Sequence, residues 1–124
     1  MEQIMVVKEF TFDAAHRLPE HPGPCKNLHG HTYRLQVGVR GPVDPKTGMV
    51  IDFGTLKRIV VDLLSELDHS YLNEVLPNIV PTAENIVCWI QDTLTRAVLS
   101  LSVSLVLIRL WETPTSYAEW KERE

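Results

Sequence analysis

Residues 29–40 read HGHTYRLQVGVR, and this stretch indicates a β-strand over about residues 29–41 that carries two histidines at its start. From residue 33 onward its odd-numbered positions are apolar and its even-numbered positions are polar or glycine, which is typical of a strand with one buried face. The apolar positions are Tyr33, Leu35, Val37 and Val39. His29 and His31 have the same parity, so both imidazoles are expected to face the buried side.

An earlier strand is predicted over residues 4–15, and a third histidine lies just beyond it. Phe12 and Ala14 share one parity in this segment, and His16 continues it. A bulge near Ala14 would move His16 to the other face. Without a bulge, two neighbouring strands direct all three imidazoles toward one point.

Three converging histidines favour a metal site. Imidazole is a common neutral ligand of zinc, and three of them leave a fourth coordination position open. Cys25 lies in the proline-rich loop between the two strands, where it is either a fourth ligand or a free thiol beside the metal. Structural zinc sites favour several thiolates, whereas three nitrogen ligands with an open position are typical of catalytic zinc. The pattern therefore favours an enzyme, although any one buried histidine taken alone fits a hydrogen-bonded core residue.

The composition is that of one globular domain spanning residues 1–124, with 44% hydrophobic and 23% charged residues. A formal net charge of −4 argues against a nucleic-acid partner, which requires a basic surface. No apolar run is long enough to span a membrane, and the first residues lack the layout of a signal peptide. Cys25 and Cys88 lie in different settings and do not suggest a disulfide, so we expect a cytoplasmic protein. Cys88 lies in an apolar, helical stretch and is expected to pack in the protein core.

Two helices are predicted after the second strand. The first begins near Asp52 or Thr55, either of which can cap it, and the second begins after Pro81 with Thr82 as its N-cap. Both helices show apolar residues at three- and four-residue spacing. The apolar positions are Leu56, Ile59, Val60, Leu63, Leu64 and Leu67 in the first helix, and Ile86, Ile90, Leu94, Ala97 and Val98 in the second.

Two more strands are predicted, over residues 103–111 and 116–121. The first of these is apolar on both parities. One parity holds Val106, Ile108 and Leu110, and the other holds Val103, Leu105, Leu107 and Trp111. A strand covered on both faces needs helices on one side and something else on the other, and copies of the same chain would provide that cover.

Six motifs together resemble the 6-pyruvoyl-tetrahydropterin synthase superfamily, in the family's order and over nearly the whole chain. They are FDAAH (12–16), CKNLHGH (25–31), VIDF (50–53), LDHSYLN (67–73), PTAEN (81–85) and ET (112–113). Three residues separate Cys25 from His29, as in the bacterial 6-carboxy-5,6,7,8-tetrahydropterin synthases of queuosine biosynthesis. Enzymes of the pyruvoyl-forming branch usually have five residues there.

The resemblance implies an α+β tunnelling fold (T-fold). In that fold a four-stranded antiparallel sheet carries two helices inserted between its second and third strands. Subunits join their sheets into a β-barrel, usually as a homohexamer built from two trimers, with active sites at subunit interfaces.

The resemblance also implies a reaction, in which 7,8-dihydroneopterin triphosphate becomes 6-carboxy-5,6,7,8-tetrahydropterin with release of acetaldehyde and triphosphate. Carried over by motif, the metal ligands for Zn²⁺ are His16, His29 and His31. Cys25 is then the thiolate that transfers protons, and a neighbouring dication would favour that ionised form. Asp68 and His69 form a proton relay, although an acid–histidine pair at a helix end also fits a simple cap.

Substrate binding is carried over in the same way. Glu112 would anchor the pterin ring, because a carboxylate accepts the two parallel donors of its guanidine-like edge. Thr82 is a candidate for a hydrogen bond to the ring, and its expected capping role explains it equally well. Arg17 and Lys26 lie close to zinc ligands in the sequence and would supply positive charge for the triphosphate.

Other functions use the same residues. The nearest alternatives are a pyruvoyl-type synthase, which eliminates triphosphate, and an enzyme that only cleaves the side chain of dihydroneopterin. A zinc hydrolase of another small molecule would need a carboxylate base beside the metal, and no motif clearly supplies one. A non-catalytic metal-binding or scaffold protein would have no need of the Cys25 thiol.

Overall fold

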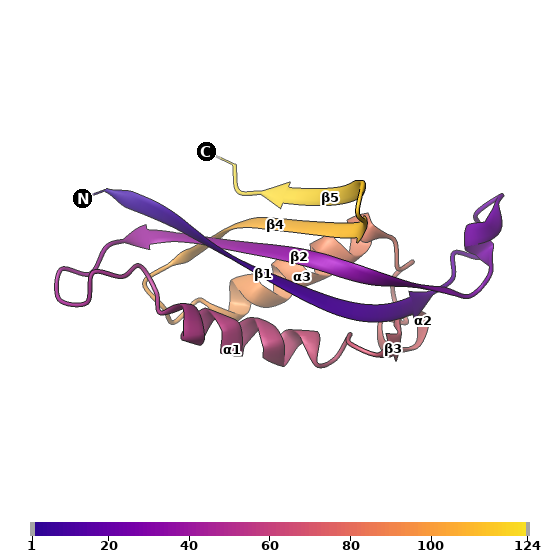
Figure 1. Cartoon of the computed structure of the whole chain (residues 1–124), viewed down its shortest axis with the longest axis horizontal. Helices are drawn as coiled ribbons and strands as arrows, with labels where there is room; N and C mark the ends of the chain where they lie inside the picture. The colour runs from indigo at the N-terminus through magenta and orange to yellow at the C-terminus, as the bar shows by residue number, and fades with distance from the viewer. Residues whose placement is uncertain (1, 124) are drawn as a thin grey trace.

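The computed structural model describes residues 2–123 and has a single mixed sheet in the order β3-β1-β2-β4-β5 (Figure 1). The long strands β1 (Gln3–His16) and β2 (His29–Pro42) pair antiparallel along their whole length. β4 (Ser104–Thr113) lies beside β2, and β5 (Ser116–Lys121) forms the far edge. The α+β class and the four predicted strands are confirmed, with strand ends within a few residues of the predicted ones.

The sheet has one strand more than predicted. The two-residue strand β3 (Ser70–Tyr71) pairs parallel with the end of β1, which makes the sheet mixed instead of purely antiparallel. A short helix, α2 (Leu72–Val75), follows at once, and a 3₁₀ turn, η1 (Pro24–Lys26), lies in the loop between β1 and β2. Elements of two to four residues are too short to show a period in the sequence, so pattern analysis missed them.

Two long helices, α1 (Phe53–Leu64) and α3 (Ala83–Ala97), lie in the chain between β2 and β4 and cover one face of the sheet (Figure 1). α1 packs against β1 and α3, and α3 packs against β4 and β5. Their predicted apolar faces are buried, except that Ile59 is half-buried and Ala97 is exposed. None of the helices within residues 2–123 is both long and apolar enough to cross a membrane.

The prediction that Cys88 packs in the core is wrong, because its residue is exposed. The buried face of α3 carries Ile86, Val87, Ile90 and Leu94. Cys88 follows Ile86 by two positions, and each position turns the helix by about 100°, so Cys88 points away from that face. An apolar sequence neighbourhood did not indicate burial here.

The predicted parity of β4 is also wrong in its first half. The pairing with β2 shifts between Gly38 and Val39, which places Leu107 opposite Gly38 but Leu105 opposite Val39. This bulge at Val106 moves Leu105 into the helix-covered core with Ile108, and leaves Val106 out of that core.

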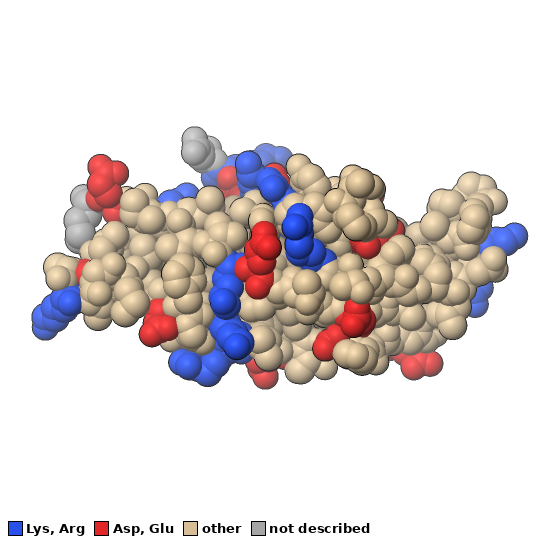
Figure 2. Space-filling view, in the orientation of Figure 1, with Lys and Arg blue, Asp and Glu red and all other residues tan. Residues whose placement is uncertain are grey.

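The face of the sheet away from the helices is covered at β4 by side chains from neighbouring strands. The Arg34 guanidinium lies 3.7 Å from the centre of the Trp111 ring, and Tyr117 packs against the same ring. Trp111 is thereby buried within one chain, so its apolar character alone does not require a second copy. Figure 2 shows acidic and basic side chains interspersed in the view of Figure 1.

Asp52 is the N-cap of α1, and Thr55, the other predicted cap, lies within the first turn of the helix. The Asp52 side chain accepts a hydrogen bond from the Gly54 N–H at 2.6 Å. We expect Asp52→Ala to lower the free energy of unfolding by about 1 kcal/mol, because a helix N–H loses its partner. Asn is an equally good cap, so Asp52→Asn should be close to wild type. Urea denaturation at one fixed protein concentration measures both variants, and equal losses in the two would contradict a capping role.

Candidate metal centre and neighbouring acid–histidine pair

Three histidines meet where β1 ends and β2 begins. His16 pairs directly with His29 across the two strands, and Ala14 pairs with His31. The register runs without a shift from Gln3 to His16, so the bulge that would have turned His16 away does not occur. The ring centres lie 4.6–5.1 Å apart, and one ring nitrogen from each histidine lies within 4.8 Å of the others. The predicted convergence is confirmed.

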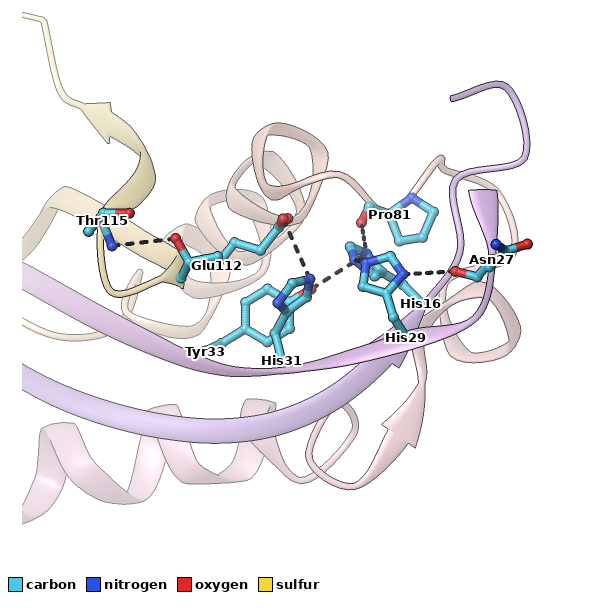
Figure 3. Close-up of polar contacts among 9 residues, drawn as sticks. His16, Asn27, His29, His31, Tyr33, Pro81, Glu112 and Thr115 are labelled. Carbon is cyan, nitrogen blue, oxygen red and sulfur yellow. Dashed lines mark hydrogen bonds and ion pairs between the residues drawn. The ribbon is translucent and has the colours of Figure 1, made fainter. Parts of the chain in front are cut away.

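Backbone carbonyls orient two of the rings (Figure 3). His16 Nδ1 lies 2.8 Å from the carbonyl oxygen of Pro81, and His29 Nδ1 lies 2.8 Å from that of Asn27. A carbonyl can only accept, so each Nδ1 carries a proton, and in the neutral form of each ring Nε2 then keeps its lone pair. The two Nε2 atoms then face each other at 3.0 Å. Two lone pairs at that distance repel, and a cation between them removes the repulsion.

The third ring, His31, has a nitrogen without a hydrogen-bond partner among residues 2–123. This nitrogen, Nε2, is buried and lies 3.6 Å from Glu112 Oε1. Burial lowers the pKa of His31, Glu112 partly opposes this, and the two neighbouring histidines lower it further. The ring is therefore neutral near pH 7, which is the form that binds metals.

This geometry fits a metal ion. Buried polar atoms without partners are rare in proteins, and here the orphaned nitrogen belongs to a group of three converging donors. Backbone carbonyls that fix the tautomer of ligating histidines are also typical of metal centres. Three imidazoles suit zinc, copper, iron or nickel, so the donor set indicates a transition metal without selecting one.

Cys25 lies outside the group of converging donor atoms. It is half-buried in η1, and its carbonyl oxygen accepts a hydrogen bond from the Leu18 N–H at 2.8 Å. Among the described residues, the donor group holds His16, His29 and His31 without this thiol. The arrangement therefore favours a free thiol over a fourth ligand.

Asp68 and His69 contact each other side to side, as a relay requires. His69 Nδ1 lies 3.0 Å from Asp68 Oδ1. The Asp13 N–H donates to the same Asp68 oxygen at 2.9 Å, and the His69 N–H donates to the Asp13 carbonyl at 2.6 Å. The hydrogen bond from the Asp13 N–H is the main reason that the pKa of Asp68 lies below its ordinary value; desolvation opposes it, and the hydrogen bonds and charge of His69 add smaller lowering effects. His69 has φ +57°, a left-handed conformation that is uncommon for residues other than glycine.

The acid–histidine pair and the three histidines lie on different sides of β1. Ala14 and His16 are buried on the helix side, whereas Asp13 is exposed on the opposite parity and groups with the pair. An open pocket of about 520 Å³ nevertheless has both His31 and His69 in its lining. One chain thus brings the two groups to the rim of a common hollow without merging them into one cluster.

Glu112, the expected anchor of the pterin ring, points toward the histidines. It lies near the end of β4 and is half-buried, and Figure 3 shows its carboxylate directed at His31. Thr82 accepts a hydrogen bond from the Asn85 N–H at 3.2 Å, which confirms its capping role in α3.

Sequence reasoning missed the groups that support the metal ligands. The carbonyls of Pro81 and Asn27 left no signal, because every residue has one. Tyr33 was predicted only as a core residue, yet its hydroxyl lies 3.5 Å from His16 Nδ1. Burial, with a smaller effect of Glu112, raises the pKa of Tyr33 above its ordinary range, so the phenol stays protonated under the site.

An α+β domain of this topology, with three histidines at the adjoining ends of two strands, is a tunnelling fold with a candidate metal centre. A model of the 6-pyruvoyl tetrahydropterin synthase family matches residues 5–123, and the chain therefore belongs to this family. It is 41% identical to the 6-carboxy-5,6,7,8-tetrahydropterin synthase of Haemophilus influenzae, over 94% of this chain and 98% of that protein.

Two further relatives are named for other activities. The chain is 40% identical to the dihydroneopterin monophosphate aldolase of Pyrococcus furiosus, over 86% of this chain and 88% of that protein. The structure of Caenorhabditis elegans 6-pyruvoyl tetrahydropterin synthase matches with a TM-score of 0.88 and 32% identity, covering 99% of this chain and 98% of the other.

Proposed function

We propose that this chain is a zinc-dependent lyase that forms 6-carboxy-5,6,7,8-tetrahydropterin from 7,8-dihydroneopterin triphosphate, with release of acetaldehyde and triphosphate. The observation that carries the proposal is the unpaired, buried Nε2 of His31 beside two Nε2 lone pairs held 3.0 Å apart. The 41% identity to a protein of that name over nearly the full length of both chains supports the choice of product.

Each ligand of the proposed zinc comes from a strand end, which holds the ring with little freedom. His16, His29 and His31 would bind the ion, and the Pro81 and Asn27 carbonyls would keep two of these rings in the ligating tautomer. When bound, zinc supplies a Lewis acid that lowers the pKa of the substrate's side-chain hydroxyls.

Proton transfer falls to Cys25, Asp68 and His69. Cys25 would remove and return protons on the substrate side chain, because it is a half-buried thiol outside the ligand group. Asp68 would hold His69 in one tautomer through the 3.0 Å contact, which leaves Nε2 of His69 free to exchange protons with solvent and substrate.

Glu112 would accept the two parallel donors of the pterin ring, with Thr82 as a second contact at the start of α3. Glu112 lies 3.6 Å from His31, so a ring anchored there would place its side chain at the metal. Arg17 and Lys26 are exposed beside the histidines in the sequence and would contribute positive charge to triphosphate binding.

We further propose a cytoplasmic homo-oligomer, a hexamer of two trimers, acting in queuosine biosynthesis. The support is the family's fold and the separation of the Asp68–His69 pair from the three histidines within one chain. Active sites shared between subunits would bring a pair from one chain to the histidines of another. No nucleic acid or membrane takes part in the proposed reaction.

Product analysis tests the reaction. We expect the zinc-loaded protein to convert 7,8-dihydroneopterin triphosphate to carboxytetrahydropterin, with one acetaldehyde trapped as its hydrazone for each pterin formed. Mass spectrometry of the pterin and the hydrazone measures both products, and chelator-treated protein is the control.

Each alternative gives a different result in the same assay. Triphosphate release without acetaldehyde identifies a pyruvoyl-type synthase. A shortened pterin without a carboxyl group, and faster reaction of the monophosphate, identify an aldolase like the Pyrococcus furiosus relative. An unchanged pterin contradicts all three activities and favours a hydrolase of another substrate.

A further inference from the structure

Asn73 holds the backbone of Arg17 with two hydrogen bonds. Its side-chain Oδ1 accepts from the Arg17 N–H at 2.9 Å, and its Nδ2 donates to the Arg17 carbonyl at 2.9 Å. The two residues are 56 positions apart in the chain. The side-chain amide of Asn73 thus makes the two hydrogen bonds that the backbone of a neighbouring strand would make. We call this pair of hydrogen bonds the Asn73 clasp.

The clasp continues the pairing of β1 with β3 past the end of β1. Ala14 pairs with Ser70 and Ala15 with Tyr71, and β1 ends at His16. Within the described part of the chain, no strand lies beside Arg17 on that edge, because the chain has already turned into α2. Asn73, in the first turn of α2, supplies the missing partner with its side chain.

Arg17 is the residue that joins the metal centre to the thiol loop. His16 precedes it, and the Leu18 that follows it donates its N–H to the carbonyl of Cys25. Fixing the backbone of Arg17 therefore fixes the base of the loop 17–28, at the end of the molecule where β3 and α2 also lie (Figure 1). The remainder of that loop is mostly exposed, and its other hydrogen bonds run within the loop or from His29 to the Asn27 carbonyl.

We propose that Asn73 is a positioning residue for proton transfer, which sets the place of Cys25 relative to the metal centre through Arg17 and Leu18. The proposal rests on the proposed function only for the role of the thiol, since the clasp itself is a structural contact. Reacting groups displaced by about 1 Å can lose on the order of 100-fold in rate. Asparagine suits this place because it offers a donor and an acceptor in one plane, whereas aspartate offers only acceptors.

Three variants test the proposal. Asn73→Ala removes both hydrogen bonds, and Asn73→Asp keeps the acceptor for the Arg17 N–H. Asn78→Ala is the matched control, because Asn78 is exposed in the turn after α2. The measurements are kcat and KM with 7,8-dihydroneopterin triphosphate, zinc content, and amide hydrogen exchange of residues 17–28.

We expect Asn73→Ala to lower kcat about 100-fold with a much smaller change in KM, and to keep its zinc. Amide exchange in residues 17–28 should become faster in this variant, since the loop loses its fixed base. Asn73→Asp keeps the acceptor for the Arg17 N–H but sets a carboxylate oxygen against the Arg17 carbonyl, so its kcat should fall and its amide exchange in residues 17–28 should become faster as well. Asn78→Ala should match wild type. If Asn73→Ala does not fold, the kcat and exchange of Asn73→Asp decide the question.

Three outcomes overturn the proposal. Unchanged exchange in residues 17–28 means that the clasp does not hold the loop. Faster exchange with unchanged kcat means that the loop base does not position the thiol. Loss of zinc together with kcat means that Asn73 acts on His16 instead. Failure of the proposed function is distinguishable from all of these, because it appears in the wild-type product analysis and leaves the exchange result intact.

Discussion

Cys25→Ala is expected to lower turnover about 1000-fold and to leave zinc bound in full. A positioned acid or base contributes on the order of 100- to 10,000-fold, and alanine cannot carry a proton. Zinc should stay, because the converging donor group consists of His16, His29 and His31 without Cys25. Steady-state kinetics on 7,8-dihydroneopterin triphosphate and metal analysis of the same preparation measure the two quantities.

The chain provides its own control for this variant. Cys88 is the other free cysteine, and it is exposed on α3 and does not belong to the converging donor group. Cys88→Ala should therefore keep both turnover and zinc. If Cys25→Ala loses its zinc, the thiol is a ligand and the site is closed to substrate. If Cys25→Ala keeps full turnover, the lyase mechanism is wrong and a hydrolase or binding protein is favoured.

The metal centre could be predicted from sequence because its ligands obey a local rule. Side chains alternate along a strand, so His29 and His31 had to share a face with Tyr33 and Leu35. The buried Tyr33 and Leu35 confirm that face. His16 required one more fact, an unbroken register across β1 and β2, which the sequence left open and the structure provides.

The features that could not be predicted depend on contacts between distant segments. The bulge at Val106 moves Leu105 to the face opposite the one that its parity predicts, and no residue in β4 indicates a bulge in the sequence. The Pro81 carbonyl orients His16 across 65 positions of chain, and a backbone group has no sequence signature. Asn73 lay within a motif that carried the family resemblance, but its partner is the backbone of Arg17.

The contact within the acid–histidine pair also could not be predicted from the sequence. Adjacent residues in a chain usually point apart, and a contact between Asp68 and His69 requires an unusual backbone. The left-handed φ of His69 provides it, held by the hydrogen bonds of both residues to Asp13. Such strain persists only where surrounding structure enforces it, and it is concentrated at functional sites.

Replacing His29 with alanine should have opposite effects with and without metal. Nε2 of His16 lies 3.0 Å from Nε2 of His29, and two neutral imidazole nitrogens with lone pairs this close would repel each other whenever no metal lies between them. His29→Ala removes that repulsion, and its ring is only half-buried, so little packing is lost. We therefore expect the metal-free variant to unfold at the same denaturant concentration as metal-free wild type, or at a higher one.

With zinc present, we expect wild type to be more stable than His29→Ala. A ligand that binds only the folded state stabilises it by about 4 kcal/mol at a free concentration 1000 times its Kd. If total zinc binding is on the order of 10 kcal/mol, removing one of three ligands costs about 3 kcal/mol, or roughly 100-fold in affinity. At a zinc concentration that saturates wild type, His29→Ala should gain far less stability and become the less stable protein. Denaturation with a chelator and with buffered zinc measures the crossover.

His21→Ala is the control, because His21 is an exposed histidine in the loop before Cys25 and lies outside the converging group. Its zinc affinity should equal that of wild type. The two alternatives for the histidines separate cleanly in this comparison. If they form only a hydrogen-bonded core cluster, His29→Ala is less stable with and without zinc by the same amount. If they hold a metal, the sign of the stability difference changes with zinc, because the same close approach of ring nitrogens that destabilises the empty site creates the affinity of the filled one.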